Sequence, residues 1–162
     1  MADFNPADFP LVKKGNQYQD FEVGQVWPHH WGRTITEADN AMFTSATCNW
    51  NPMYINAEFA KAHGHPATVV NPMLVLCTAV GMSVEDLSEG GGPFLGVEDC
   101  RFLAPVYPGD TLTAESVVLD KRESSSRPTN GIVTWETKVT NQRGETVLTY
   151  RRTNLVAKRR EA

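Results

Sequence analysis

The run from Met73 to about Ser83 constrains the fold of this chain more than any other segment. Its residues are apolar on nearly every face of a helix, and Pro72 before it suits a first helical turn, where its missing N–H is not needed. A helix without a polar side has to be buried. The sequence therefore predicts a long central helix from about Pro72 to Ser83, with the rest of the fold wrapped around it.

After this helix the pattern becomes strand-like. Four β-branched and partly alternating runs follow, separated by turns rich in glycine, proline, asparagine and serine: Phe94–Phe102, Thr111–Asp120, Ile132–Thr140 and Thr146–Val156. An earlier run lies between Gln25 and Ile35, where Pro28 confines it to an edge or a bend. We expect an α+β fold, in which an antiparallel meander of the four later runs joins the early strand in a curved sheet of about five strands around the helix.

The chain before the central helix carries start and stop signals for two shorter helices. Thr36 is a suitable N-cap for a helix through about Ala46. Asn56 can cap a second helix from Ala57 to His63, which Gly64 can end in a left-handed conformation. The segment between these helices, residues 47–56, is therefore expected to form a turn.

Composition narrows the classes of function. With 162 residues and a net charge of -4, the chain has the length of one domain and no basic field for a nucleic acid. No run approaches the ~20 apolar residues of a membrane span. Three widely spaced cysteines predict neither a disulfide framework nor a metal site: Cys48, Cys77 and Cys100. We expect a soluble, cytoplasmic protein with reduced, mostly buried thiols, no metal, and neither nucleic acid nor membrane as a partner.

The two ends of the chain are expected to lie outside the domain. Residues 1–20 are polar and interrupted by prolines and a glycine, which is typical of an extended arm. Residues 158–162 form a basic tail. The domain itself is expected to cover residues 21–157.

Two asparagine-proline turns carry polar groups that could serve a small-molecule site. Asn51-Pro52 lies in the turn between the short helices, and Asn71-Pro72 precedes the central helix. Polar side chains in turns that packed helices hold in place can present chemistry to a substrate. Asn-Pro is also an ordinary turn signal that needs no chemistry to explain it.

The order of elements and two motifs resemble the MaoC-like family of the hotdog superfamily, which includes the (R)-specific enoyl-CoA hydratases. Residues 101–112, R-F-L-A-P-V-Y-P-G-D-T-L, are similar to the family's R-F-x-x-P-V-x-x-G-D-T-L. Asn51-Pro52 followed by residues 57–60, A-E-F-A, is similar to its N-P-x-H-x-D-x-x-F-A. The resemblance covers about Phe21 to Val156. It implies one hotdog domain, paired as a homodimer or a dimer of dimers, that acts on an acyl-CoA thioester with no cofactor other than the coenzyme A of the substrate.

A smaller group within this family resembles the chain further, at residues 83–87, 121–128 and 141–145. Its members are often associated with hydration of short branched C5 dicarboxylyl-CoA esters of the mesaconyl or itaconyl kind. Arg122 and Arg127 could then bind the second carboxylate or a CoA phosphate through paired N–H donors. They are equally compatible with solvated residues of a hairpin.

The family's catalytic residues are replaced in this chain. The resemblance implies an Asp and a His in a G-D-x-N-P-x-H motif and a backbone N–H in a later H-G-M motif. Alignment of that pattern without a gap puts Cys48 at its glycine, Asn49 at the aspartate, Tyr54 at the first histidine, and Asn71 and Pro72 at the H-G pair. Asn49 cannot take up a proton, Tyr54 is a better donor than acceptor because an unperturbed tyrosine has a pKa of ~10, and Pro72 has no N–H.

Three accounts are compatible with these replacements. In the first, the chain is still a hydratase or dehydratase, with Tyr54 as the acid and Asn49 placing the water or substrate. The Asn71 side chain, the Met73 amide or the Tyr54 hydroxyl then replaces the lost oxyanion donor beside Pro72, and Trp50 and Asn51 contact the substrate. The base comes from one of five further residues: His63, His65, His29, His30 or Asp39.

In the second account, the pocket still holds an acyl thioester but performs another reaction, such as isomerisation, thioester hydrolysis or a biosynthetic tailoring step. In the third, the chain is a non-catalytic acyl-CoA-binding or dimer-partner subunit.

Overall fold

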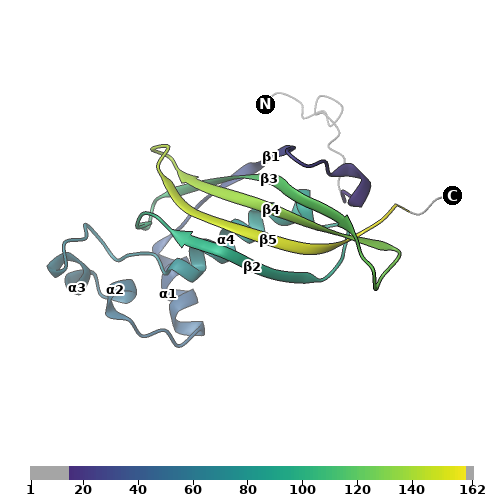
Figure 1. The fold of residues 1–162 in the computed structure, drawn as a ribbon. Helices are drawn as coiled ribbons and strands as arrows, with labels where there is room; N and C mark the ends of the chain where they lie inside the picture. The colour runs from purple at the N-terminus through teal and green to yellow at the C-terminus, as the bar shows by residue number, and fades with distance from the viewer. Residues whose placement is uncertain (1–14, 160–162) are drawn as a thin grey trace, which may run out of the picture.

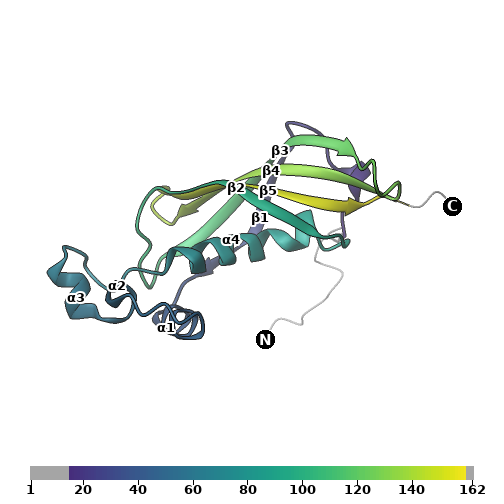
Figure 2. The ribbon, with the colours of Figure 1, turned by 60° about the horizontal axis from the view of Figure 1, so that its bottom comes forward.

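A five-stranded antiparallel sheet with one long helix against it forms the frame of the structure, a computed structural model that describes residues 15–159. The helix is α4 (Pro72–Leu87), and it lies along one face of the sheet (Figures 1 and 2). The strand order is β1-β3-β4-β5-β2. The strands are β1 (Val26–Thr34), β2 (Phe94–Phe102), β3 (Thr111–Glu123), β4 (Asn130–Asn141) and β5 (Thr146–Ala157). The predicted α+β class, the five strands and the long helix are confirmed.

The strand order corrects the predicted four-strand meander. Only β3, β4 and β5 follow one another as neighbours, whereas β2 pairs with β5 and forms the edge opposite β1. The connection from β2 to β3 crosses the end of the sheet instead of turning back as a hairpin. It is held there because Val106 is buried and its carbonyl accepts a hydrogen bond from Val70 N, just before α4. Pro28 lies on the edge strand β1, as predicted.

The helix α4 is buried on one side only. Its buried residues face the sheet: Val75, Leu76, Ala79, Ser83 and Leu87. On the outer side, Met73 is 49% exposed and Val84 is 41% exposed. The expectation that the whole helix is covered is therefore wrong for a single chain, because one sheet can cover only one side of a helix.

Three short helices gather at one end of the sheet, beside the start of α4 (Figure 1). They are α1 (Glu37–Ala46), α2 (Pro52–Ile55) and α3 (Ala57–Ala62). The Thr36 hydroxyl accepts a hydrogen bond from Asp39 N, and Asn56 Oδ1 accepts one from Phe59 N. Gly64 follows α3 with φ of 87°. The predicted caps and the left-handed glycine are thus confirmed.

The described parts of the two chain ends contact each other. Arg159 Nη2 lies 2.7 Å from Asp20 Oδ1, and its backbone N–H donates to Gln19 Oε1. Lys158 forms an ion pair with Glu123 at 3.0 Å. Residues 1–14 of the predicted arm and residues 160–162 of the predicted tail lie outside the described residues.

The three thiols are free, and none of them is buried. Cys48 and Cys77 are exposed, and Cys100 is half-buried. The expectation of mostly buried thiols is wrong because Cys48 lies in an exposed turn and Cys77 lies on the outer side of α4. Among the described residues, no helix is long and apolar enough to cross a membrane.

A buried polar network lies between the sheet and the second half of α4. His29 Nδ1 lies 2.6 Å from Asp86 Oδ2, and His29 Nε2 lies 2.8 Å from Ser116 Oγ. Arg152, which is 1% exposed, donates to the hydroxyls of Ser83 and Ser88 at the end of α4. A cation near the C-terminal end of a helix is stabilised by the helix dipole. This network therefore fixes how α4 lies on the sheet.

We expect His29 to make the free energy of unfolding depend on pH. Burial lowers the pKa of the His29 imidazole below its ordinary value, against the opposing effect of Asp86. The unfolded state then takes up a proton more readily than the folded state. The stability linked to His29 is therefore complete above the ordinary pKa of about 6.5 and is lost as the pH falls toward the folded value.

Urea unfolding at pH 7.5 and pH 5.5 measures this effect. The wild type should lose more stability between the two pH values than the variant His29→Gln, which has no imidazole to protonate. Equal losses in both proteins would show that His29 is not the group responsible.

Candidate active site

The two asparagine-proline turns are helix starts with the same geometry. Asn51 Oδ1 accepts a hydrogen bond from Met53 N at the start of α2, and Asn71 Oδ1 accepts one from Met73 N at the start of α4, both at 3.0 Å. In each case the proline occupies the first helical turn. Each asparagine therefore has a structural role as a helix cap at the expected turn.

Cys48 supports the register of the first motif. Its φ is 54°, in the left-handed region that glycine adopts without strain and other residues adopt at a cost. This is the position at which the family pattern has glycine. The turn that follows is closed by a 3.0 Å hydrogen bond from Asn49 N to Thr44 O. The chain thus keeps the backbone conformation of the motif although the glycine is replaced.

A hollow of 230 Å³ opens beside the first turn of α4. Its lining comes from α1, the turn after it, and the start of α4: Phe43, Thr47, Asn49, Asn71 and Met73. The structure thus brings three of the predicted site residues together. Tyr54 is not part of this lining, and neither is any aspartate, glutamate or histidine. We call this hollow the asparagine hollow.

Asn71 contributes an unused hydrogen-bond donor to this region. The residue is 1% exposed, and its Oδ1 is occupied by the Met73 amide. Its Nδ2 is buried and has no hydrogen-bond partner among the described residues. Buried polar groups are nearly always paired, so an unpaired amide in a hollow's lining is suited to the carbonyl of a ligand or to an oxyanion.

The backbone at the start of α4 offers no comparable donor. Pro72 has no N–H, and the Met73 amide donates to Asn71 Oδ1. The amides of Leu74 and Val75 both donate to Asn71 O, at 2.9 and 3.2 Å. The Met73 amide, which the sequence suggested as a replacement donor, is therefore already engaged. Of the other two suggested donors, the Asn71 side chain belongs to a residue of the hollow's lining, whereas Tyr54 does not line it.

Asn40 connects the two motifs, and the sequence did not single it out. Its Nδ2 donates to Tyr54 O at 2.9 Å and to Val69 O at 3.0 Å, and its Oδ1 accepts from Asn71 N at 2.8 Å. The residue is 1% exposed and lies on α1. One buried amide thus fixes the backbones of Tyr54 and Asn71 relative to each other. An asparagine within a helix, where this residue type is not favoured, was the available signal.

The predicted bases at residues 63 and 65 have other partners. The ring of His63 stacks on Phe59 with 4.1 Å between centroids, and His63 Nδ1 lies 2.8 Å from Phe59 O. His65 Nδ1 lies 2.9 Å from the hydroxyl of Tyr107. Neither lines the asparagine hollow.

The other three candidate bases are also held elsewhere. His29 belongs to the buried network under α4, and His30 Nε2 lies 3.6 Å from Glu85. Asp39 accepts hydrogen bonds from Thr36, which lower the pKa of its carboxyl below the ordinary value, and the Arg33 cation acts in the same direction. A carboxyl with a lowered pKa is a weaker base, so Asp39 is poorly suited to that role.

The remaining predicted contacts are spread over the surface. Asn51 is exposed, and Trp50 is 64% exposed, so neither is enclosed with the asparagine hollow in a single chain. Arg122 is about 35 Å along β3 from Thr111, at about 3.3 Å per residue. Thr111 follows Asp110, whose carbonyl accepts a hydrogen bond from Ile35 N just before α1, so Thr111 lies at the end of the sheet near the short helices. Arg122 therefore lies at the opposite end of the sheet. Arg127 follows it in the hairpin, so the structure does not bring these arginines to the site.

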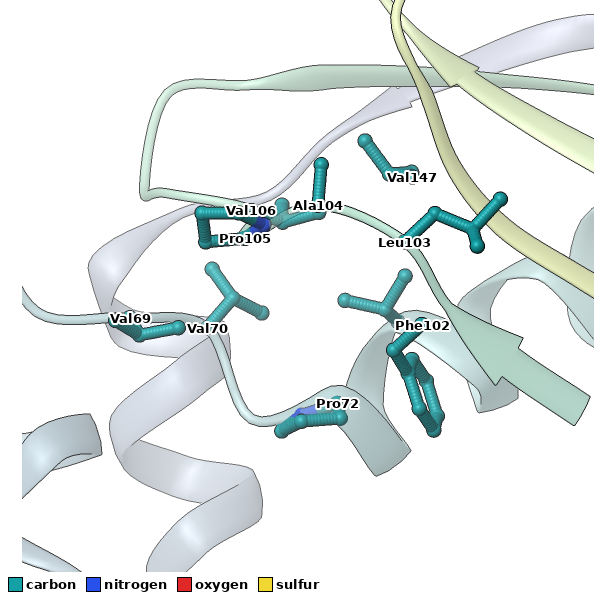
Figure 3. A pocket seen from close by; sticks show the side chains of 10 residues that line it. Val69, Val70, Pro72, Phe102, Leu103, Ala104, Pro105, Val106 and Val147 are labelled. Atoms are coloured by element: carbon teal, nitrogen blue, oxygen red, sulfur yellow. The ribbon is translucent and has the colours of Figure 1, made fainter.

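A second hollow of 230 Å³ lies on the other side of Pro72 (Figure 3). All of its lining residues are apolar: Val69, Val70, Pro72, Val75, Phe102, Leu103, Ala104, Pro105, Val106 and Val147. Residues 102–106 belong to the R-F-L-A-P-V motif. The motif therefore forms one wall of an apolar hollow next to the start of α4. No group of three or more potential metal ligands occurs among the described residues.

Comparison with known proteins agrees with this geometry. Residues 9–162 match the family model described as mesaconyl-CoA hydratase. The mesaconyl-CoA hydratase of Haloarcula hispanica is 39% identical over 151 residues, which are 93% of this chain and 42% of that protein. The chain thus spans less than half the length of this curated relative.

Solved structures show the same fold. A structure from Chloroflexus aurantiacus, described as a MaoC domain protein dehydratase, is 34% identical with a TM-score of 0.85 over 99% of this chain and 43% of that chain. A Mycobacterium tuberculosis protein described as having a double hotdog fold is 22% identical with a TM-score of 0.82, over 91% of this chain and 46% of that chain. The chain is a hotdog domain that belongs to the mesaconyl-CoA hydratase family, within the MaoC-like hydratases and dehydratases.

Proposed function

We propose that the chain adds water reversibly to a 2-enoyl-CoA thioester, with a short branched C5 dicarboxylyl group, such as mesaconyl, as the acyl part. The observation that carries this proposal is Asn71, a residue of the lining of the asparagine hollow whose buried Nδ2 has no hydrogen-bond partner among the described residues. The name of the Haloarcula hispanica relative supports the choice of reaction and acyl group. Coenzyme A enters as part of the substrate, and the proposed reaction needs no other cofactor.

In this reaction Asn71 Nδ2 donates a hydrogen bond to the thioester oxygen as negative charge develops on it. Asn49, on the same hollow, holds the water or the substrate through its amide. Neither amide can transfer a proton near neutral pH. Tyr54, at the position of the family histidine, is the proposed group that gives a proton to the α-carbon and takes back the proton that the attacking water releases, so that it ends as a neutral phenol, and Asn40 fixes its backbone.

The lining of the asparagine hollow also favours one alternative. It has no carboxylate or imidazole that could activate water. A chain with this lining could bind an acyl-CoA thioester without converting it and serve as the partner of a catalytic subunit.

We also propose that the chain forms a homodimer or a dimer of dimers in the cytoplasm. The open edge strand β2 and the residue after it expose four large apolar side chains: Phe94, Leu95, Phe102 and Leu103. The outer side of α4 is exposed as well, and the curated relative has more than twice the length that this chain matches. The location in the cytoplasm is supported by the three free thiols, because cysteines stay reduced in that compartment. A molar mass in solution of two or four chains would support the assembly, and a monomer would contradict it.

Incubation of the purified protein with mesaconyl-CoA and crotonyl-CoA tests the function. Loss of the absorbance of the conjugated thioester would support hydration. A raised melting temperature without turnover would support the non-catalytic alternative, because a ligand stabilises the state that binds it. If neither thioester is converted and neither raises the melting temperature, both proposals are wrong.

A further inference from the structure

A dicarboxylyl thioester carries a second carboxylate, which needs a cationic partner when it is taken out of water. No cation lines the asparagine hollow, and the apolar hollow of Figure 3 has none either. Arg122 and Arg127, which the sequence suggested for this task, are at the opposite end of the sheet. If the proposed substrate is correct, a different cationic residue has to pair with its second carboxylate.

Arg33 is a cation beside the start of α4. It lines a hollow of 380 Å³ between β1, α1 and α4, which we call the arginine hollow. Its other lining residues are Trp31, Gly32, Ile35, Asp39, Leu74, Thr78, Gly81 and Met82. Leu74 directly follows Met73 of the asparagine hollow, and Asp39 directly precedes Asn40, which binds Asn71 N. The two hollows are therefore neighbours along both α1 and α4.

The guanidinium of Arg33 is held in place by Asp39 but does not use all of its N–H donors. Its Nη2 lies 2.9 Å from Asp39 Oδ1. The other oxygen of Asp39 accepts from the backbone and hydroxyl of Thr36 at 2.8 and 2.7 Å, so the carboxylate itself is fixed. A guanidinium has five N–H donors. Among the described residues, one hydrogen bond of Arg33 is found, which leaves donors for a second oxyanion.

The floor of the arginine hollow contains a glycine that this chain does not need for its own packing. Gly81 lies within α4, where glycine destabilises a helix relative to alanine. A Cβ at this position would meet no atom within 4 Å. The absence of a side chain at Gly81 thus enlarges the arginine hollow. The lining of this hollow also includes Thr78, which carries a hydroxyl.

We propose that Arg33 binds the free carboxylate of the acyl group and so determines that the chain prefers a short dicarboxylyl thioester. This inference rests on the proposed function. The shared chemistry is an oxyanion that a guanidinium binds through two parallel N–H donors, and a CoA phosphate is the other possible source of such an anion. The acyl carboxylate is favoured because Arg33 pairs with Asp39, which directly precedes Asn40, the residue that binds Asn71 N.

A comparison of two thioesters in the full chain tests the proposal. Crotonyl-CoA has the same coenzyme as mesaconyl-CoA but no second carboxylate. In the variant Arg33→Gln, we expect the KM for mesaconyl-CoA to rise about ten-fold and the KM for crotonyl-CoA to stay unchanged, because a charge-assisted hydrogen bond is lost on one substrate only. The rise in melting temperature with each thioester provides the same comparison without turnover.

Arg143→Gln is the matched control. Arg143 is 51% exposed and pairs with Asp110 at 2.8 Å, whereas Arg33 is 56% exposed and pairs with Asp39 at 2.9 Å. Arg143 lines none of the three hollows described here, so its substitution should leave the ratio of the two KM values unchanged. An equal loss on both substrates in Arg33→Gln would assign the anion to a CoA phosphate and overturn the proposal. An unchanged ratio with unchanged KM values would overturn any anion-binding role. A wild type that converts neither thioester would refute the hydratase function separately.

Discussion

The variant Asn71→Asp should lose about 10²- to 10³-fold in kcat/KM for an enoyl-CoA thioester. Aspartate keeps an oxygen that can cap Met73 N, but it replaces the unpaired Nδ2 donor with a second oxygen. The transition state then loses a hydrogen bond to the developing oxyanion and faces a negative charge, and loss of one oxyanion donor typically costs this much. The capping bond is retained, but a buried carboxylate lowers stability, so kcat/KM is compared at a temperature where thermal unfolding shows that the variant is folded.

Asn56→Asp is the control for the effect of aspartate at a helix cap. Asn56 caps α3 by the same kind of bond, from Phe59 N to Oδ1 at 3.0 Å, but it is exposed and lies outside the asparagine hollow. This variant should keep its activity. If Asn71→Asp also kept full kcat/KM, the Asn71 side chain would not be the oxyanion donor, and the proposed mechanism would lose its main support.

The variant Asn40→Ala should lower both stability and activity. It leaves three buried or partly buried backbone groups without partners, those of Tyr54, Val69 and Asn71. Each unsatisfied group costs about 1 to 3 kcal/mol, so we expect the free energy of unfolding to fall by about 3 kcal/mol or more. Because the same bonds fix Tyr54 relative to Asn71, kcat should also fall at a temperature where the variant is fully folded.

Asn141→Ala separates these two effects. Asn141 is 3% exposed and also makes three hydrogen bonds, to Arg143 N, Glu145 N and Glu145 Oε2, in the turn between β4 and β5. It should destabilise the fold to a similar degree in urea unfolding but leave kcat unchanged. If Asn40→Ala lost stability but retained the kcat of the wild type, Asn40 would be a structural residue only.

Local signals predicted the elements of this fold well. The bounds of β2 were correct, and the caps at Thr36 and Asn56 were found where the sequence placed them. These features depend on groups a few residues apart, such as a side-chain oxygen and the amide two or three positions later. The position of β2 beside β5 was missed because strand pairing depends on a connection that crosses the end of the sheet, and no local pattern encodes it.

The candidate site shows the same division. The two motifs that the alignment identified contribute Asn49, Asn71 and Met73 to the lining of one hollow. The alignment could not show that Met73 N is already bonded, that Asn40 joins the motifs, or that Tyr54 lies outside the lining. Arg122 and Arg127 lie at the opposite end of the sheet, whereas Arg33, for which the sequence predicts only a place in a strand, lines the arginine hollow.

Residue periodicity, hydrogen bonds between near neighbours and motifs with fixed spacing were enough to predict the helices, the strands, the caps at Thr36 and Asn56 and the family from the amino-acid sequence. The folded structure was needed to show which polar residues line a hollow, which polar groups are already paired, and which cation lies beside the start of α4. Those properties arise from contacts between segments that are distant in the chain, and a hydrogen bond such as that of Asn40 to Asn71, 31 residues apart, exists only once the fold has formed.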